Sequence, residues 1–334
     1  MASPKLQRAG RREFLTRCAA AAASGLLLGG TAEAAEVPAG RVPAGGSPAA
    51  PLPTIRLGPH RVSRLIVGSN PISGYSYLGH ELDQEMKAYF TPERTQAMLQ
   101  ECEQLGINTH QYSMASKATE VYRKLREQGS KLQLIGLHRD WKEVKPMLAA
   151  NRPIAVAHHG GVTDKLFREG HSGRVRDFVK AARDEGLLAG VSSHNPDNIK
   201  RIADEGWQVD FFMTCFYFLT REKPPPAGQG GAPPAVLGST VEKTFYQADP
   251  AAMCAVIRQV EQPCLAFKIL GAGRLCASQE IVREAFRFAF THIKPIDAVI
   301  VGMYPRRIDQ PRSNADYTRE LASSRLAGKH EGGP

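Results

Sequence analysis

The chain has 334 residues, 42% of them hydrophobic, and a formal net charge of +10 at neutral pH. This length and hydrophobic content suit one large globular domain or two small ones. The basic residues form no dense stripe with interleaved aromatic side chains, so we expect no nucleic-acid partner. Beyond the first 34 residues no segment is long and apolar enough to cross a bilayer, so we expect no stable membrane span.

Residues 1–34 have the pattern of a twin-arginine export signal. Paired arginines at positions 11 and 12 precede an apolar pair at 14–15, an Ala- and Leu-rich run at 18–28 and a small-residue site at 32–34. We therefore expect the twin-arginine translocation machinery as a partner and a periplasmic or secreted mature protein. That route carries folded cargo, often with its cofactor in place. The alternative is a basic N-terminus before an unstructured Ala-rich tail.

Composition divides the remaining chain into three parts. Residues 35–53 are rich in Pro, Gly and Ala and predict a flexible linker, 54–326 have the content of a folded domain, and 327–334 predict a disordered tail. The five cysteines after the signal are odd in number and form no Cys-x-x-Cys pair. They indicate free thiols, although an oxidising compartment would permit one bridge.

From residue 64 onward, short apolar runs alternate with amphipathic segments eight times. The expected strands are 65–69, 107–112, 133–138, 154–159, 187–192, 211–215, 264–268 and 298–302. The expected helices are 92–105, 117–128, 141–150, 174–185, 196–205, 250–259, 279–290 and 317–326. Continuous apolar strands joined by helices predict a parallel sheet covered on its outside, and eight units match a (β/α)8 TIM barrel. An open doubly wound sheet is less favoured because no Gly-x-Gly-x-x-Gly turn follows the first strand.

Polar residues gather where the expected strands end, which is where barrel enzymes keep their sites. The longest strand-to-helix connection, 218–249, is rich in Pro and Gly and predicts either a flap over the site or a disordered insertion.

The sequence at several strand ends resembles the aldo-keto reductase superfamily. The similar segments are 57–68, 105–109, 190–195, 267–275 and 301–314, in the family's order, and the resemblance extends from 56 to about 320. It implies a TIM barrel that binds NADP and reduces carbonyl groups. The resemblance also implies a cofactor-binding set, which consists of Ser192, His194, Asn195, Lys268, Arg274, Arg307 and Asn314.

The sequence departs from the family at its catalytic tetrad. The family's Asp falls on Gln111, its Tyr on Ser116 and its Lys on His138, and only its His is matched, at His158. Carbonyl reduction needs an acid that protonates the developing alkoxide, and here that Tyr is missing. A tyrosine from another loop, Tyr75, Tyr77 or Tyr112, would have to replace it.

We expect the catalytic residues to be His158, His138, Gln111 and Lys268, facing one central cavity. The predicted function is that of an exported aldo-keto-reductase-like barrel, an oxidoreductase with a rebuilt active site for a small carbonyl or sugar-like substrate.

Two alternatives to this function stay open. Imidazoles at the strand ends, with a carboxylate such as Asp140 or Asp164, could hold a divalent metal or perform metal-free hydrolase, isomerase or lyase chemistry. No metal motif is present, and we assign no metal ligand. Adjacent His158 and His159 must also point to opposite faces of their strand. The second alternative is a non-catalytic ligand-binding barrel.

Overall fold

The computed structural model describes residues 50–113, 117–222 and 244–327. The predicted signal, most of the predicted linker, the tail after 327 and the middle of the 218–249 connection lie outside these residues.

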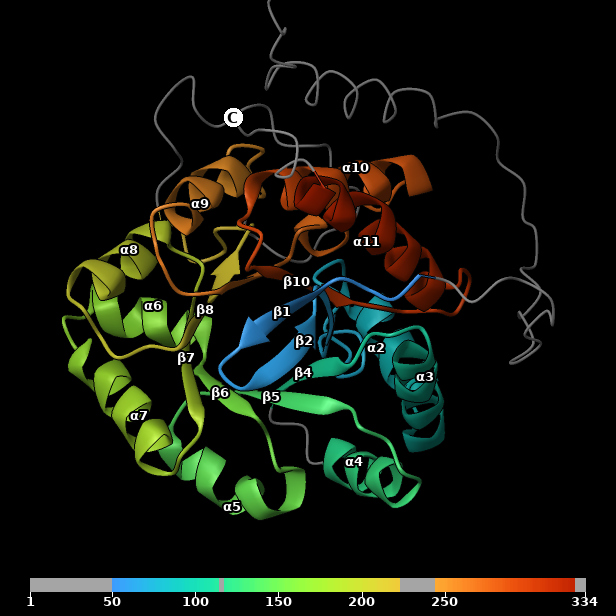
Figure 1. The fold of residues 1–334 in the computed structure, drawn as a ribbon, viewed down its shortest axis with the longest axis horizontal. Helices are drawn as coiled ribbons and strands as arrows, with labels where there is room; N and C mark the ends of the chain where they lie inside the picture. The colour runs from blue at the N-terminus through green and yellow to red at the C-terminus, as the bar shows by residue number, and fades with distance from the viewer. Residues whose placement is uncertain (1–49, 114–116, 223–243, 328–334) are drawn as a thin grey trace, which may run out of the picture.

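Eight parallel strands close into one barrel, in the order β10-β3-β4-β5-β6-β7-β8-β9 (Figure 1). Their bounds are β3 Leu65–Gly68, β4 Thr109–Ser113, β5 Gln133–His138, β6 Ala155–His158, β7 Leu188–Ser193, β8 Phe211–Cys215, β9 Cys264–Phe267 and β10 Ala298–Gly302. The predicted TIM barrel is therefore confirmed, with each strand within two residues of its expected position at either end.

Eight predicted helices surround the barrel. They are α3 Pro92–Gln104, α4 Lys117–Glu127, α5 Trp141–Asn151, α7 Gly173–Asp184, α8 Pro196–Asp204, α9 Asp249–Ile257, α10 Gln279–His292 and α11 Gln310–Ala327. Side-chain caps explain two of the starts: the Thr91 hydroxyl accepts from the Arg94 amide, and the Asn195 side chain accepts from the Asp197 amide.

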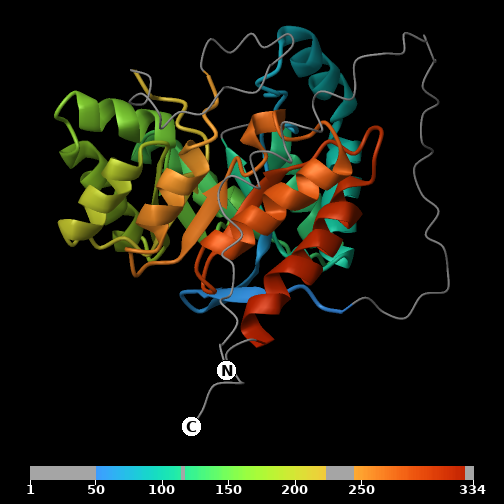
Figure 2. The same ribbon diagram turned by 90° about the horizontal axis from the view of Figure 1, so that it is seen from above.

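Two helices were not predicted, α2 His80–Tyr89 and α6 Gly160–Arg168. Neither has a side-chain cap at its start, and α2 buries only Met86, so it lacks an apolar face. Both lie on the C-terminal side of a barrel strand, and Figure 2 shows α2 at the end of the barrel opposite the β1–β2 hairpin.

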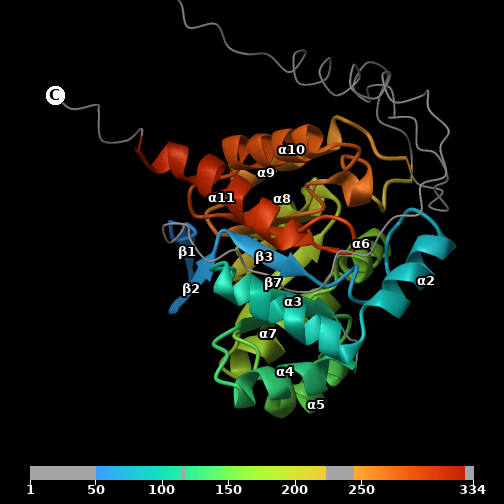
Figure 3. The ribbon, with the colours of Figure 1, turned by 90° about the vertical axis from the view of Figure 1, so that its right-hand side faces the viewer.

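A two-stranded hairpin, β1 Thr54–Leu57 and β2 His60–Ser63, covers the N-terminal end of the barrel (Figure 3). Its inward side chains Ile55, Leu57 and Val62 pack in one cluster with the barrel's interior residues. That end is therefore sealed, and only the C-terminal end is left for a site.

The boundary predicted between linker and domain is two residues too late. Leu52 is buried in the core, and the Arg64 amide donates to the Pro53 carbonyl, so both residues belong to the barrel domain. Four of the five cysteines in the described ranges are buried free thiols, and the fifth, Cys276, is free and exposed. None of the helices described has the length and apolar character that a membrane crossing requires.

A buried arginine stabilises the closure of the barrel. Arg64 is 2% exposed, and its guanidinium donates to the carbonyls of Asp297 (2.9 Å), Ala322 (3.1 Å) and Lys294 (3.2 Å). It thereby links β3 to the loop before β10 and to α11.

We expect Arg64→Met to lower the free energy of unfolding by about 3–5 kcal/mol, because buried carbonyls would lose their donors. The control is Arg61→Met, since Arg61 is exposed and its guanidinium donates to the Thr54 hydroxyl. Urea titration of both variants measures the difference. A loss below about 1 kcal/mol for Arg64→Met would show that water replaces the guanidinium.

Candidate functional site

Side chains along each barrel strand alternate between the interior and the helix layer. On β6, Ala155 and Ala157 belong to the interior cluster, whereas Val156 packs with the helices. Gln111 and Lys268 line an interior cavity, as expected from the sequence.

His138 and His158 point the other way, so the expectation that they face the same cavity as Gln111 and Lys268 is wrong. The His138 ring packs edge-on against Tyr112, and His158 packs against Phe178 of α7 while its Nδ1 lies 2.7 Å from the Thr163 hydroxyl. These partners all belong to the layer between barrel and helices. The next residue, His159, continues the inward alternation and lines the cavity instead.

The other two strand-end histidines, His110 and His194, also lie on opposite sides of the barrel wall. His110 is an outer-layer residue whose Nδ1 lies 3.0 Å from the Val67 carbonyl and whose Nε2 lies 3.1 Å from the Tyr122 hydroxyl. His194 packs against the inward Phe267. Only His159 and His194 of the five therefore lie on the side of the barrel mouth.

His194 is held by a buried carboxylate. Asp164 of α6 is 4% exposed and accepts from the Nδ1 of His194 (2.9 Å), from the His194 amide (3.1 Å) and from the Thr220 hydroxyl (2.8 Å). Burial alone would raise the pKa of Asp164, but hydrogen bonds and the charge of His194 outweigh it, so the net shift is downward. Asp164 is thus an ionised group that fixes the orientation of the His194 ring.

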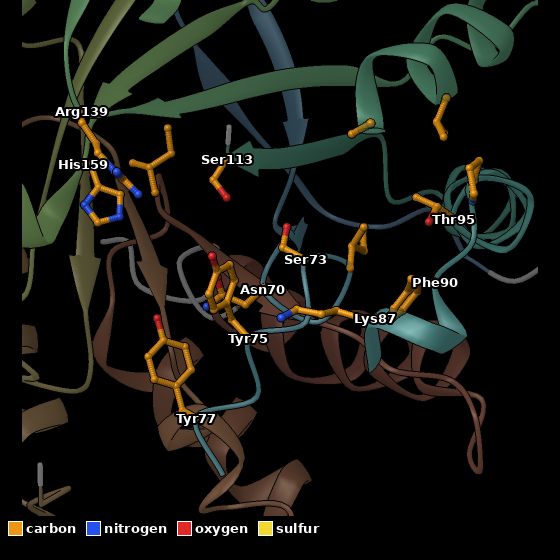
Figure 4. A pocket seen from close by; sticks show the side chains of 15 residues that line it. Asn70, Ser73, Tyr75, Tyr77, Lys87, Phe90, Thr95, Ser113, Arg139 and His159 are labelled. Carbon is orange, nitrogen blue, oxygen red and sulfur yellow. The ribbon is translucent and has the colours of Figure 1, made fainter. Parts of the chain in front are cut away.

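The larger of two cavities at the barrel mouth has a volume of about 550 Å³. Figure 4 shows Arg139 and His159 at one end, Lys87 entering from another side, and Tyr75 and Tyr77 projecting into the same space. Its walls come from the loop after β3, from α2, α3 and α4, and from the ends of β4, β5 and β6.

A second cavity of about 300 Å³ lies between the ends of β3, β9 and β10. It is lined largely by apolar side chains such as Phe267 and Ile300, with the polar groups of Gln111, Lys268 and Asn314. The two cavities share Asn70, Tyr75 and Tyr77 in their linings, so they meet at the loop after β3.

Tyr77 and Lys268 form a strained pair at this junction. The Lys268 ammonium nitrogen lies 3.9 Å from the centroid of the Tyr77 ring. Both residues have positive φ angles, 61° for Tyr77 and 56° for Lys268, which cost of order 1–3 kcal/mol each in residues other than glycine. Strain of this kind concentrates at functional sites.

His159 is neutral over the physiological pH range. Burial, followed by the positive charges of His194, Arg139 and Lys268, lowers the pKa of His159 to about 4. Its Nδ1 is buried and has no hydrogen-bond partner in the described chain. A neutral imidazole with a free ring nitrogen can donate to or accept from a bound molecule.

Only part of the predicted cofactor-binding set lines the second cavity. Lys268 and Asn314 do so. Asn195 serves as the N-cap of α8, and Arg307 is exposed. Arg274 lies over the Tyr217 ring and donates to the carbonyl of Gly271, at the start of the turn η1 Gly271–Gly273.

Two further residues of that set, Ser192 and His194, lie near Gly160 on another side of the mouth. Metal ligation finds no support in the geometry: the described residues contain no group of three or more His, Cys, Asp or Glu side chains that could hold an ion.

No known protein family and no curated protein matches the chain. Among solved structures, it is similar to the glycerol dehydrogenase AKR11B4 from Gluconobacter oxydans, with a TM-score of 0.50 and 14% identity over 84% of this chain and 97% of that one. It is also similar to the holo form of the aldo-keto reductase AKR11C1 from Bacillus halodurans, with a TM-score of 0.50 and 13% identity over 82% and 96%. The fold is therefore an aldo-keto-reductase-like (β/α)8 TIM barrel. At this identity the likeness shows the fold alone.

Sequence reasoning did not assign His159 and Lys87 to the cavity that they line. The alternation of side chains along β6 indicated that one of His158 and His159 faces inward, but not which one. Lys87 lies on the unpredicted α2, so no signal pointed to it.

Proposed function

We propose that this chain is an exported oxidoreductase that interconverts a small carbonyl compound and its alcohol. It would use a nicotinamide cofactor and a general acid at a different position from the catalytic Tyr of the aldo-keto reductases. The observation that carries the proposal is the meeting of the two cavities at Tyr77, under the Lys268 ammonium. Tyr77 and Lys268 lie on different elements from those that carry the Tyr and Lys of the aldo-keto reductase tetrad. Together they would take the place of that pair. The twin-arginine pattern of residues 1–34 supports export.

In the proposed reaction a hydride adds to the carbonyl carbon and the oxygen takes up a proton. A reduced nicotinamide supplies the hydride when bound. Tyr77 donates the proton from its hydroxyl, which gives the phenolate, and Lys268 stabilises that negative charge before solvent reprotonates it. His159 is neutral at pH 7 and lines the same cavity as Tyr77, so it would contact the substrate without adding charge.

The second cavity fits the inner end of such a cofactor. Asn314 is 4% exposed, and its carboxamide makes no hydrogen bond to the part of the chain that the structure describes. Asn314, Gln111 and Lys268 would contact the polar groups of the cofactor, and Phe267 would form the apolar wall beside it. On the loop after β10, Arg306 is paired with Glu85 at 2.6 Å and Arg307 is exposed, so Arg307 is a cation that would contact a phosphate there.

We expect the purified protein to bind NADPH or NADH, as seen in the cofactor's fluorescence, and to oxidise it with glucuronate as the carbonyl substrate. Asn314→Ala should weaken cofactor binding about tenfold, because a buried polar contact is lost. Ser313→Ala is the matched control, since its exposed hydroxyl donates only to the Asp309 carbonyl. Failure of the protein to bind either cofactor would overturn the proposal.

The Asp164–His194 pair favours a second candidate, metal-free acid–base chemistry such as isomerisation or elimination. A carboxylate that orients an imidazole is a common arrangement for a general base. This candidate replaces the first if the protein converts a substrate with no nicotinamide present and Asp164→Asn abolishes that conversion.

A further inference from the structure

Among the described residues that line the larger cavity, the side chains with a permanent charge are all cations. Its lining contains two cations, Lys87 and Arg139, together with His159, and no Asp or Glu. Lys268 adds a third cation at the junction with the second cavity. A cavity with walls of low polarisability and one sign of charge concentrates ligands of the opposite charge.

Neither cation is paired with a carboxylate in the part of the chain that the structure describes. Within the described ranges, Lys87 and Arg139 form no ion pair, and their side chains make no hydrogen bond to another residue. Arg306, on the loop after β10, is by contrast paired with Glu85. The contrast shows that the charge of the larger cavity is left available for a ligand.

The wall beside Arg139 is formed by His159, the residue directly before α6. This nine-residue helix begins at Gly160 directly after His159, which is its N-cap and makes no side-chain capping bond. Its first amides therefore add partial positive charge to the same wall.

Two unsatisfied polar side chains lie at this helix start. The Ser192 hydroxyl, in a residue only 1% exposed, has no hydrogen-bond partner in the described chain and lies 2.9 Å from where a Cβ on Gly160 would be. The buried Nδ1 of His159 is the second. Buried donors of this kind are costly unless a ligand or water satisfies them.

We propose that the larger cavity binds the carboxylate or phosphate group of an anionic substrate at the wall formed by Arg139 and His159, next to the start of α6. Arg139 supplies the planar donor pair that suits such oxyanions, and Lys87 supplies a second positive charge from the facing side (Figure 4). This inference rests on the proposed function in that it places the anion next to the proposed reacting groups, Tyr77 and Lys268. It makes the substrate a carbonyl or hydroxy acid, or a sugar phosphate, rather than a neutral sugar or aldehyde.

The test compares matched ligands on the full chain without cofactor, by calorimetry. Glucuronate is paired with glucose, and glyceraldehyde 3-phosphate with glyceraldehyde, so that the two arms separate a carboxylate from a phosphate. We expect at least one anion to bind about tenfold or more tightly than its neutral partner. We also expect that preference to shrink as the salt concentration rises from about 0.05 M to about 0.5 M.

Arg139→Gln and Lys87→Gln should each weaken binding of the preferred anion, the first by about tenfold or more. Lys145→Gln is the control, because Lys145 is an exposed cation on α5, the helix that follows Arg139. Equal binding of the charged and neutral probes, binding of none of the four, or the same affinity in Arg139→Gln and Lys145→Gln overturns the inference. Because no nicotinamide is present, these results are independent of whether the protein binds NADPH.

Discussion

Replacing Tyr77 by phenylalanine is expected to lower kcat about 10²–10⁴-fold, the range that a general acid contributes, while the affinity for NADPH changes little. The reason is that the substitution keeps an aromatic ring under the Lys268 ammonium and removes only the hydroxyl that donates the proton. Steady-state rates of NADPH oxidation and fluorescence titration of the same preparation measure the two effects.

Tyr75→Phe is the matched control for this prediction. Tyr75 lines both cavities, but its side chain is 57% exposed and it has no cation over its ring in the described structure. We expect it to retain most of the activity. If Tyr75→Phe is the inactive variant and Tyr77→Phe is active, the proton donor is Tyr75, and the Tyr77–Lys268 pair is structural.

The folded protein is expected to lose stability steeply as the pH falls from about 6.5 to 4. Burial lowers the pKa of His110, His138, His158 and His159 to about 4 in each case, from an ordinary value of 6.5. Between these values the unfolded chain binds more protons than the folded one. Each histidine then contributes up to about 1.4 kcal/mol per pH unit to the loss, and the stabilisation is complete above about pH 6.5. Asp297 opposes them, because burial raises its pKa to about 6.

His138→Phe and His110→Phe separate this effect from loss of hydrogen bonds. Neither ring nitrogen of His138 has a partner in the described chain, so His138→Phe should reduce the acid dependence without lowering stability at pH 7.5. His110→Phe should reduce the same dependence but also destabilise at pH 7.5, because Val67 and Tyr122 lose their partner. Urea titrations from pH 4.5 to 7.5 provide the comparison. An acid dependence unchanged in both variants would contradict the assignment to buried histidines.

The elements of the barrel could be predicted because their signals are local. Apolar runs of four to six residues and caps such as Thr91 and Asn195 lie within single segments of sequence. The helix α2 escaped prediction because it has no capping side chain and buries only Met86. Contacts distant in sequence hold it in place: Glu85 accepts from the Tyr304 hydroxyl and pairs with Arg306.

The sequence by itself determined the fold class, the end of the barrel where polar groups gather, and the absence of the family's Tyr at position 116. Only the tertiary structure decided which groups share the cavity. Strands of a barrel covered by helices are apolar on both faces, so the composition of β6 does not show whether His158 or His159 faces inward. A shift of one residue exchanges the two faces of a strand, and closure of the barrel with its neighbours sets that choice. The same closure brings Tyr77, from the loop after β3, under Lys268, from the end of β9.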